Sequence, residues 1–193
     1  MWYNLHIMAK IGDDRMGFSN RGLRGGTFEE IINITNQRYK SQGLAVVEKI
    51  PTPITPVAID KESRTITLAY FEKKSTVDYI GAVQGIPICF DAKETRQKSF
   101  PINNIHRHQI EFMEAFVAQR GIAFMLVNFA ALGQCFFLPF EDLKPLWEAA
   151  QKGGKKSVSH EDFDPAYIVE QKGGQLKYLD AVSTYIEAGN YYE

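Results

Sequence analysis

Apolar and polar residues follow two different periods along this 193-residue chain, and each period predicts a kind of element. Apolar residues that recur every three or four positions, as from Ile105 to Phe116, predict helices. Continuous apolar runs such as IAFMLVNF predict buried strands. Thr27 and Glu30 form a capping box that begins one helix, and Gly43 ends it. Together these patterns predict helices over 27–41, 105–119, 141–151 and 176–188, and strands over 44–50, 122–129 and 134–138.

Two further segments predict β-hairpins. In the first, at about 53–75, the β-prone runs PVAI and RTITLAYF flank the polar turn DKES. Many of its positions are polar where a core strand is apolar, so we expect a ribbon that stands away from the body. The second hairpin consists of 76–80, a glycine-bounded turn at 81–85, and 86–93. The order of elements predicts an α/β fold with a mixed central sheet flanked by helices and a projecting β-hairpin stalk.

Composition narrows the class of protein. The first 26 residues are glycine-rich with interspersed arginines, which predicts a flexible basic arm, and residues 27–193 are expected to form a single domain. No apolar run reaches the roughly 18 residues that span a bilayer, and no secretory signal is present, so we expect a cytoplasmic protein without a membrane partner. Cys89 and Cys135 are expected to be buried thiols.

Charge is distributed unevenly along the chain. The formal net charge is −1, but residues 1–110 carry +4 and residues 111–193 carry −5. This asymmetry permits a basic face on one side of the molecule, although many enzymes show the same by chance.

Asp78, Asp91 and Lys93 form the pattern D-x12-D-x-K. Strand side chains alternate, so Asp91 and Lys93 share a face, and a hairpin closed by the glycines places Asp78 beside Asp91 at one edge of the sheet. Two aspartates suit a hard cation such as Mg²⁺, which polarises a phosphoryl oxygen and lowers the pKa of a bound water. Lys93 can orient that water or stabilise developing charge. The pattern favours phosphodiester hydrolysis, but a solvated strand edge with an Asp–Lys pair explains the same residues equally well.

Two residues outside this pattern bear on the same site. Glu29 lies with Glu30 in the first turn of the first helix, where the helix dipole favours carboxylates in any protein, yet a glutamate there often completes a metal or water site. Gln109 falls on the apolar stripe of the helix over 105–119. A buried amide needs partners, and the carboxylates could provide them. We therefore favour a site role for Gln109 over a satisfied core glutamine.

Several short strings together resemble the RecU family of Holliday junction resolvases, within the PD-(D/E)xK (restriction-endonuclease-like) nuclease superfamily. They appear in family order over roughly residues 19–145, and the region past about Trp147 matches poorly. Asp91 stands where family members tend to have glutamate, and Val77 stands where a hydroxyl residue is common. The strings are SNRG (19–22), PTP (51–53), AYF (69–71), STVDY (75–79), DAKET (91–95), SFP (99–101) and HQIE (108–111).

The resemblance implies a homodimer that binds a four-way junction and places symmetric paired nicks, in DNA recombination and repair. It also implies contact with the bacterial recombinase. Asp78 and Asp91 would bind Mg²⁺, with Mn²⁺ as the alternative; Lys93 would serve the attacking water, and Glu29 would support the site beside Gln109. The hairpin would be the family's stalk, directed toward the centre of the junction. DNA contacts are expected from the arm and the stalk, at Arg21, Arg24, Lys61, Arg64, Phe71, Lys73 and Lys74.

Two other functions compete with the resolvase. One is a junction-binding or recombinase-modulating accessory protein that does not cleave, and the other is a restriction-type endonuclease that cuts duplex DNA. The D-x-K string disfavours a pure binder, because carboxylates without a metal weaken phosphate affinity. The restriction-type alternative lacks an evident added recognition segment.

His106 and His108 are not expected to form a metal site, because residues two apart on a helix do not share a face. We expect them to be surface histidines near the DNA path.

Overall fold

The computed structural model describes residues 28–71, 76–189 and 191. A mixed six-stranded sheet forms its centre, in the order β1-β4-β5-β7-β8-β10, as the element order predicts. Neighbouring strands are antiparallel except β5 and β7, which are parallel because a helix, α2 (Arg107–Ala118), connects them. The strands are β1 (Ala45–Lys49), β4 (Tyr79–Val83), β5 (Ile86–Thr95), β7 (Ile122–Phe129), β8 (Gln134–Pro139) and β10 (Ile168–Val169).

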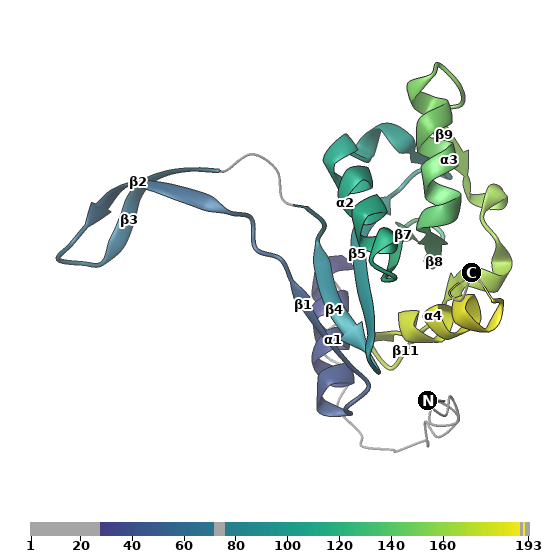
Figure 1. Cartoon of the computed structure of the whole chain (residues 1–193), viewed down its shortest axis with the longest axis horizontal. Helices are drawn as coiled ribbons and strands as arrows, with labels where there is room; N and C mark the ends of the chain where they lie inside the picture. The colour runs from purple at the N-terminus through teal and green to yellow at the C-terminus, as the bar shows by residue number, and fades with distance from the viewer. Residues whose placement is uncertain (1–27, 72–75, 190, 192–193) are drawn as a thin grey trace.

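Helices cover both faces of the sheet, because side chains of its inner strands alternate between two apolar cores (Figure 1). One core lies under α1 and α4 and includes Phe90, Phe124 and Tyr178. The other lies under α2 and α3 and includes Met113 and Met125. The helices are α1 (Phe28–Ser41), α2 (Arg107–Ala118), α3 (Phe140–Gln151) and α4 (Tyr178–Glu187).

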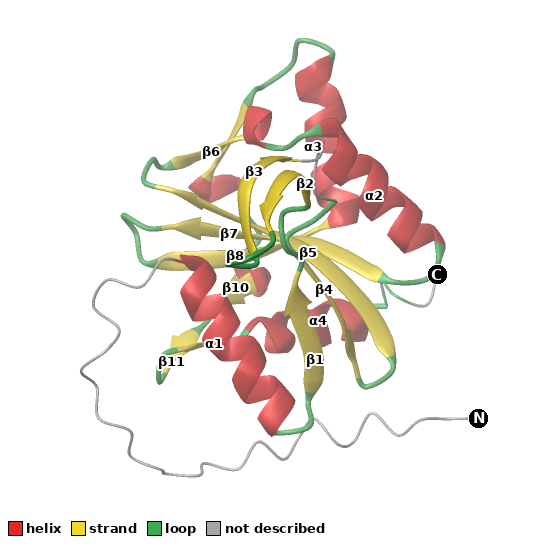
Figure 2. Ribbon diagram, turned by 90° about the vertical axis from the view of Figure 1, so that its left-hand side faces the viewer, coloured by secondary structure: helices red, strands yellow, loops and turns green. Residues whose placement is uncertain are grey.

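Strands β2 (Ile54–Asp60) and β3 (Thr65–Phe71) form a two-stranded sheet of their own. In Figure 1 this hairpin extends away from the body, and in Figure 2, which looks from its side, it stands in front of the central sheet. The polar turn is as predicted: the Asp60 carboxylate accepts hydrogen bonds from the Glu62 backbone N–H at 2.9 Å and the Ser63 hydroxyl at 2.6 Å. Both strands are solvent-exposed along most of their length.

The second hairpin differs from the prediction. Its first strand does not occupy 76–80 but begins at Tyr79 and continues to Val83, so the turn is only Gln84–Gly85. Gly81, expected in the turn, lies inside β4 opposite Val47 of β1. A Cβ at Gly81 would stand 2.2 Å from the Val46 carbonyl oxygen, so the close approach of β1 requires glycine there.

The remaining elements complete the second half of the chain. The predicted helix over 105–119 begins at Arg107, because residues 102–104 form a 3₁₀ turn, η2 (Ile102–Asn104). The predicted helix near 176–188 is α4, and 153–156 is a loop. Cys89 and Cys135 are buried free thiols, in opposite cores. The short elements are β6 (Ser99–Pro101), β9 (Ser157–Ser159), η3 (His160–Asp162), η4 (Pro165–Tyr167), β11 (Gln171–Lys172) and β12 (Gln175–Leu176).

Some expectations fall outside the described residues, among them the capping residue Thr27 and the arm over 1–26. Of the helices in the described part of the chain, none combines the length and the apolar character that crossing a bilayer would require.

Candidate active site

The β4–β5 hairpin places two aspartates side by side. Tyr79 pairs with Phe90 in the strand register, so Asp78, just before β4, stands opposite Asp91. Each carboxylate binds the backbone of the other strand: the Asp78 N–H donates to Asp91 Oδ1 at 2.9 Å, and the Ala92 N–H donates to Asp78 Oδ2 at 3.0 Å. This reciprocal arrangement confirms that the hairpin brings the two residues together, and it holds both carboxylates at defined positions.

Lys93 joins the two aspartates. Its Nζ lies 2.8 Å from Asp91 Oδ2 and 4.0 Å from Asp78 Oδ2. Asp91 and Lys93 share a face of β5, as strand alternation predicts, and the apolar Phe90 points into the opposite core. Convergence of the three groups is therefore confirmed.

The expected position at an edge of the sheet is wrong. β5 is an interior strand between β4 and β7, and Asp91 is 0% exposed. The alternative interpretation, an Asp–Lys pair at a solvent-exposed strand edge, therefore does not apply to Asp91. The side chains of Asp78 and Lys93 remain about a quarter exposed, at 27% and 23%, so the site opens to solvent through them.

Gln109 supplies the partner that a buried amide needs. Its Nε2 donates to Asp91 Oδ2, and its Oε1 accepts the His106 backbone N–H at 2.9 Å. Because the amide oxygen is engaged by the backbone, the amide nitrogen is directed at the carboxylate. The predicted contact between α2 and the carboxylate site is confirmed, and Gln109 acts on Asp91 rather than on solvent.

Burial and charge make Asp91 an unusual carboxyl. Loss of solvation in the core, and next the neighbouring Asp78 charge, raise the pKa of Asp91 to about 6, whereas the Lys93 ammonium lowers it. Two carboxylates and one ammonium leave a net negative charge at the site. A further cation would relieve that charge, which is the electrostatic condition for metal binding at a pair of aspartates.

The donor set fits Mg²⁺ better than a softer metal. No group of three or more His, Cys, Asp or Glu side chains gathers within residues 28–71, 76–189 and 191. Asp78 and Asp91 thus offer two carboxylates, and waters and phosphate oxygens would supply the other ligands. Mg²⁺ is commonly bound in this way, through one or two carboxylates with several waters retained.

Glu29 stands apart from the aspartates. It lies in the first turn of α1, half-exposed, and its carboxylate pairs with Lys49 of β1. The Tyr79 hydroxyl lies 3.5 Å from the Glu29 carbonyl oxygen and donates to Asn33 Oδ1 at 3.1 Å. The helix bearing Glu29 is therefore tied to the strand that follows Asp78. Sequence reasoning missed Tyr79, although it directly follows Asp78 in STVDY.

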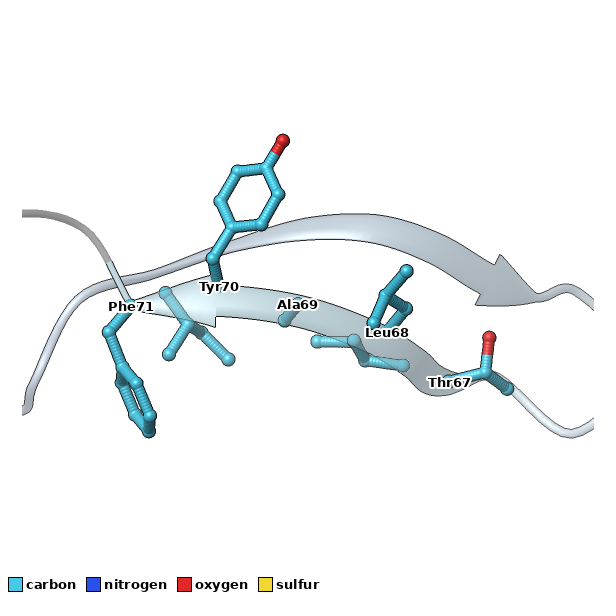
Figure 3. Close-up of a pocket in the computed structure, with 7 residues that line it drawn as sticks. Thr67, Leu68, Ala69, Tyr70 and Phe71 are labelled. Carbon is cyan, nitrogen blue, oxygen red and sulfur yellow. The ribbon is translucent and has the colours of Figure 1, made fainter.

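The structure describes some of the predicted DNA-contact residues but not all of them. Phe71 is 77% exposed at the end of β3, and its ring and that of Tyr70 point to opposite sides of the strand (Figure 3). Lys61 and Arg64 are exposed in the hairpin turn, where Arg64 has a φ of 55°. Arg21, Arg24, Lys73 and Lys74 lie outside the described residues.

His106 and His108 differ from the expectation. His106 is the N-cap of α2 and has extended backbone angles, so the rule that residues two apart on a helix face different sides does not apply. The two imidazole rings stack, with centroids 5.4 Å apart and an interplanar angle of 13°. His106 is exposed, whereas His108 is only partly so. The pair lies beside Gln109.

Comparison with known proteins identifies relatives across most of the chain. Residues 23–184 match the family described as RecU, Recombination protein U. The chain is 42% identical over 173 residues to the Holliday junction resolvase RecU of Leuconostoc mesenteroides. The aligned residues cover 86% of this chain and 84% of that protein. It is 41% identical over 188 residues to the Holliday junction resolvase RecU of Streptococcus gordonii, covering 95% and 92% respectively.

The family match corrects the expected end of the resemblance. It continues well past Trp147, to residue 184 in α4. The structural reason lies in the core: Tyr178 of α4 packs against Phe90 with ring centroids 5.2 Å apart. The C-terminal segment therefore supports the strand that carries Asp91.

Proposed function

The chain belongs to the RecU family, and from that premise we propose that it is a Holliday junction resolvase, an endonuclease that cuts branched DNA in recombination and repair. The observation that carries the proposal is the buried Asp91, which is held by Gln109, Lys93 and the Asp78 backbone and faces a second carboxylate. A binding module has no need to bury one carboxylate beside a second where phosphate would approach, with a single ammonium to neutralise the two.

Asp78 and Asp91 would hold Mg²⁺, or Mn²⁺ through the same oxygens. When bound, the ion polarises the phosphoryl oxygen and makes its water a better nucleophile. The Lys93 Nζ stands 2.8 Å from Asp91 Oδ2, and the lysine side chain is partly exposed, so it can orient the attacking water or stabilise charge on the phosphate. Gln109 keeps the Asp91 carboxylate in one orientation. This division of roles, on a hairpin of a mixed sheet, supports assignment to the PD-(D/E)xK nuclease fold.

The β2–β3 hairpin would be the stalk that enters the junction. Its apolar side chains belong to neither of the two cores that the described residues form, and a shallow hollow is lined by Ile54 and by 66–71, as Figure 3 shows. Unstacked bases at a crossover offer aromatic faces against which Phe71 can lie, and Lys61 and Arg64 can contact phosphates. Lys73, Lys74 and the arm residues Arg21 and Arg24 extend the same proposal.

Symmetric paired nicks require two active sites. A four-way junction has two-fold symmetry, so a homodimer would present one site to each of two strands. Contact with the bacterial recombinase, which the family resemblance implies, stays a prediction.

The test is cleavage of a synthetic four-way junction. In Mg²⁺ the protein should give paired nicks at symmetry-related positions and leave linear duplex largely intact, and EDTA should abolish cleavage. Asp78→Asn and Asp91→Asn should each lower the cleavage rate about a thousandfold, since metal ions contribute several kcal/mol of transition-state stabilisation. Both should still bind the junction, because removing a negative charge does not repel phosphate.

Asp180→Asn is the matched control. Asp180 is an exposed aspartate of α4, which covers the face of the sheet opposite to that of Asp91, and its amide variant should cut at the parent rate. Normal cleavage by either Asp78→Asn or Asp91→Asn would show that the active site lies elsewhere.

A further inference from the structure

Tyr79 occupies a position between two parts of the candidate site. It is 0% exposed and begins β4, directly after Asp78. Its side chain points to the face covered by α1, where the hydroxyl donates to Asn33 Oδ1 at 3.1 Å and lies 3.5 Å from the Glu29 carbonyl oxygen. One phenol thus connects the strand after Asp78 to the first turn of the helix bearing Glu29.

Aromatic packing fixes the direction of this phenol. The Tyr79 ring stacks on Phe90 with centroids 4.7 Å apart and planes 14° apart, and Phe90 stacks on Phe124 at 4.8 Å and 17°. Tyr79 directly follows Asp78 in the sequence, and Phe90 directly precedes Asp91. The two aromatic side chains therefore point to the face of the hairpin opposite to that of the aspartates. Because the ring cannot turn without disturbing this stack, the hydroxyl stays at a set position relative to Asp78.

A salt bridge holds the same part of α1. Burial first, and then the charges of Glu29 and Asp78, raise the pKa of Tyr79, so its hydroxyl keeps its proton and remains a donor. Lys49, the register partner of Tyr79 on β1, pairs with Glu29. Two neighbouring strands therefore hold the first two turns of α1, one through Glu29 and the other through Asn33.

We propose that Tyr79 is a positioning residue for the nuclease reaction, and that its hydroxyl sets the first turn of α1 so that Glu29 stands at a fixed place relative to Asp78 and Asp91. The inference rests on the proposed function, because it assumes a metal at the two aspartates. Glu29 would then be held where it can orient water at the aspartate pair, without entering the hydrogen-bond network of Asp91. Tyr79 touches no reacting atom and acts only through the helix.

Tyr79→Phe tests the proposal, since it keeps the stacked ring and removes only the hydroxyl. Removing a group that orients metal ligands without binding the metal typically lowers metal affinity 10–100-fold, so the Mg²⁺ concentration for half-maximal cleavage should rise about tenfold. The rate at saturating Mg²⁺ should stay within about twofold of the parent rate. Calorimetric titration of the DNA-free protein with Mn²⁺ should show the same loss of affinity without any cleavage.

Tyr178→Phe is the matched control. Tyr178 is also fully buried, and its hydroxyl donates to the side chain of Asn36, one turn further along α1, at 2.6 Å. This variant loses an equivalent hydrogen bond to the same helix but should leave the metal requirement unchanged. An equal shift in both variants would overturn the proposal, because any loosening of α1 would then suffice. Asn33→Ala, which removes the acceptor instead of the donor, should reproduce the effect of Tyr79→Phe.

A double-mutant cycle identifies the residue through which Tyr79 acts. Glu29→Gln should raise the metal requirement by itself, and adding Tyr79→Phe should change it no further. Full additivity of the two substitutions would overturn the proposal. If Tyr79→Phe is without effect while Asp78→Asn is inactive, the positioning role fails and the nuclease site stands; if Asp78→Asn cuts normally, the proposed function itself fails.

Discussion

Two antiparallel hairpins follow one another in this chain and end in opposite surroundings. The β4–β5 hairpin is enclosed between β1 and β7 with helices on both faces, and its residues Ile88, Cys89 and Phe90 are completely buried. Among the described strands, β2 and β3 pair with each other alone, and Ile59 and Leu68 are 57% and 56% exposed. The first carries the two aspartates, and the second carries the aromatic and basic residues that we propose meet DNA.

The difference in burial between the two hairpins corresponds to two separate requirements of the proposed reaction. Chemistry at a phosphate needs groups held in place and shifted from their ordinary pKa, and only a packed interior provides both. Recognition of a branched substrate needs a surface that reaches into the junction, and apolar side chains without a core partner supply it. Substitutions in the two hairpins should therefore affect different quantities.

The largest contrast is expected in folding stability. Ile88→Ala in β5 removes a fully buried side chain and should lower the free energy of unfolding by about 2–5 kcal/mol. Ile66→Ala in β3 makes the same chemical change at a side chain that is 47% exposed, and should lower it by less than about 1 kcal/mol. Urea denaturation of both variants measures the difference. Equal losses would mean that the β2–β3 hairpin packs against something in solution.

The next effect concerns pH and belongs to the buried hairpin alone. The pKa of Asp91 is about 6 in the folded protein against an ordinary 3.8, so between these values the folded state keeps a proton that the unfolded state has released. The free energy of unfolding should therefore fall as pH rises from about 4 through 6, by up to about 3 kcal/mol from this group.

Asp91→Asn isolates that contribution, because every other group titrates in both proteins. In EDTA, the stability of the variant relative to the parent should increase from pH 4 to pH 7 and then level off. Mg²⁺ should stabilise the parent and not the variant at pH 7. A stability difference that does not change with pH would show that the Asp91 carboxyl is not desolvated.

The smallest effect is expected at the exposed hairpin. Phe71→Ala should weaken binding of a four-way junction by about 1–3 kcal/mol, the usual value of stacking one base on an aromatic ring, and leave stability and duplex binding nearly unchanged. Ile66→Ala serves as the control, since it removes an exposed apolar side chain from the same strand without removing a ring. Comparable losses of junction affinity in both would indicate general apolar contact in place of stacking.

Local patterns in the sequence predicted the elements, because they depend on neighbours along the chain. The D-x12-D-x-K spacing correctly predicted that Asp78, Asp91 and Lys93 converge, since a hairpin links them through local pairing. The amide on the apolar stripe of α2 likewise predicted a polar partner for Gln109. Where the pattern was ambiguous it failed locally: Gly81 was assigned to a turn, because a glycine required by a neighbouring strand resembles a glycine required by a bend.

Tertiary structure alone decided the surroundings of these residues. That β5 is an interior strand, and that its Asp91 is buried with a raised pKa, depends on β7 and α2, which follow it in the chain. The phenol of Tyr79 meets Asn33 only because α1 packs on the face of the sheet toward which Tyr79 points. Spacing along a chain carries the alternation of side chains, but burial, dielectric environment and long-range hydrogen bonds arise only when distant segments pack together.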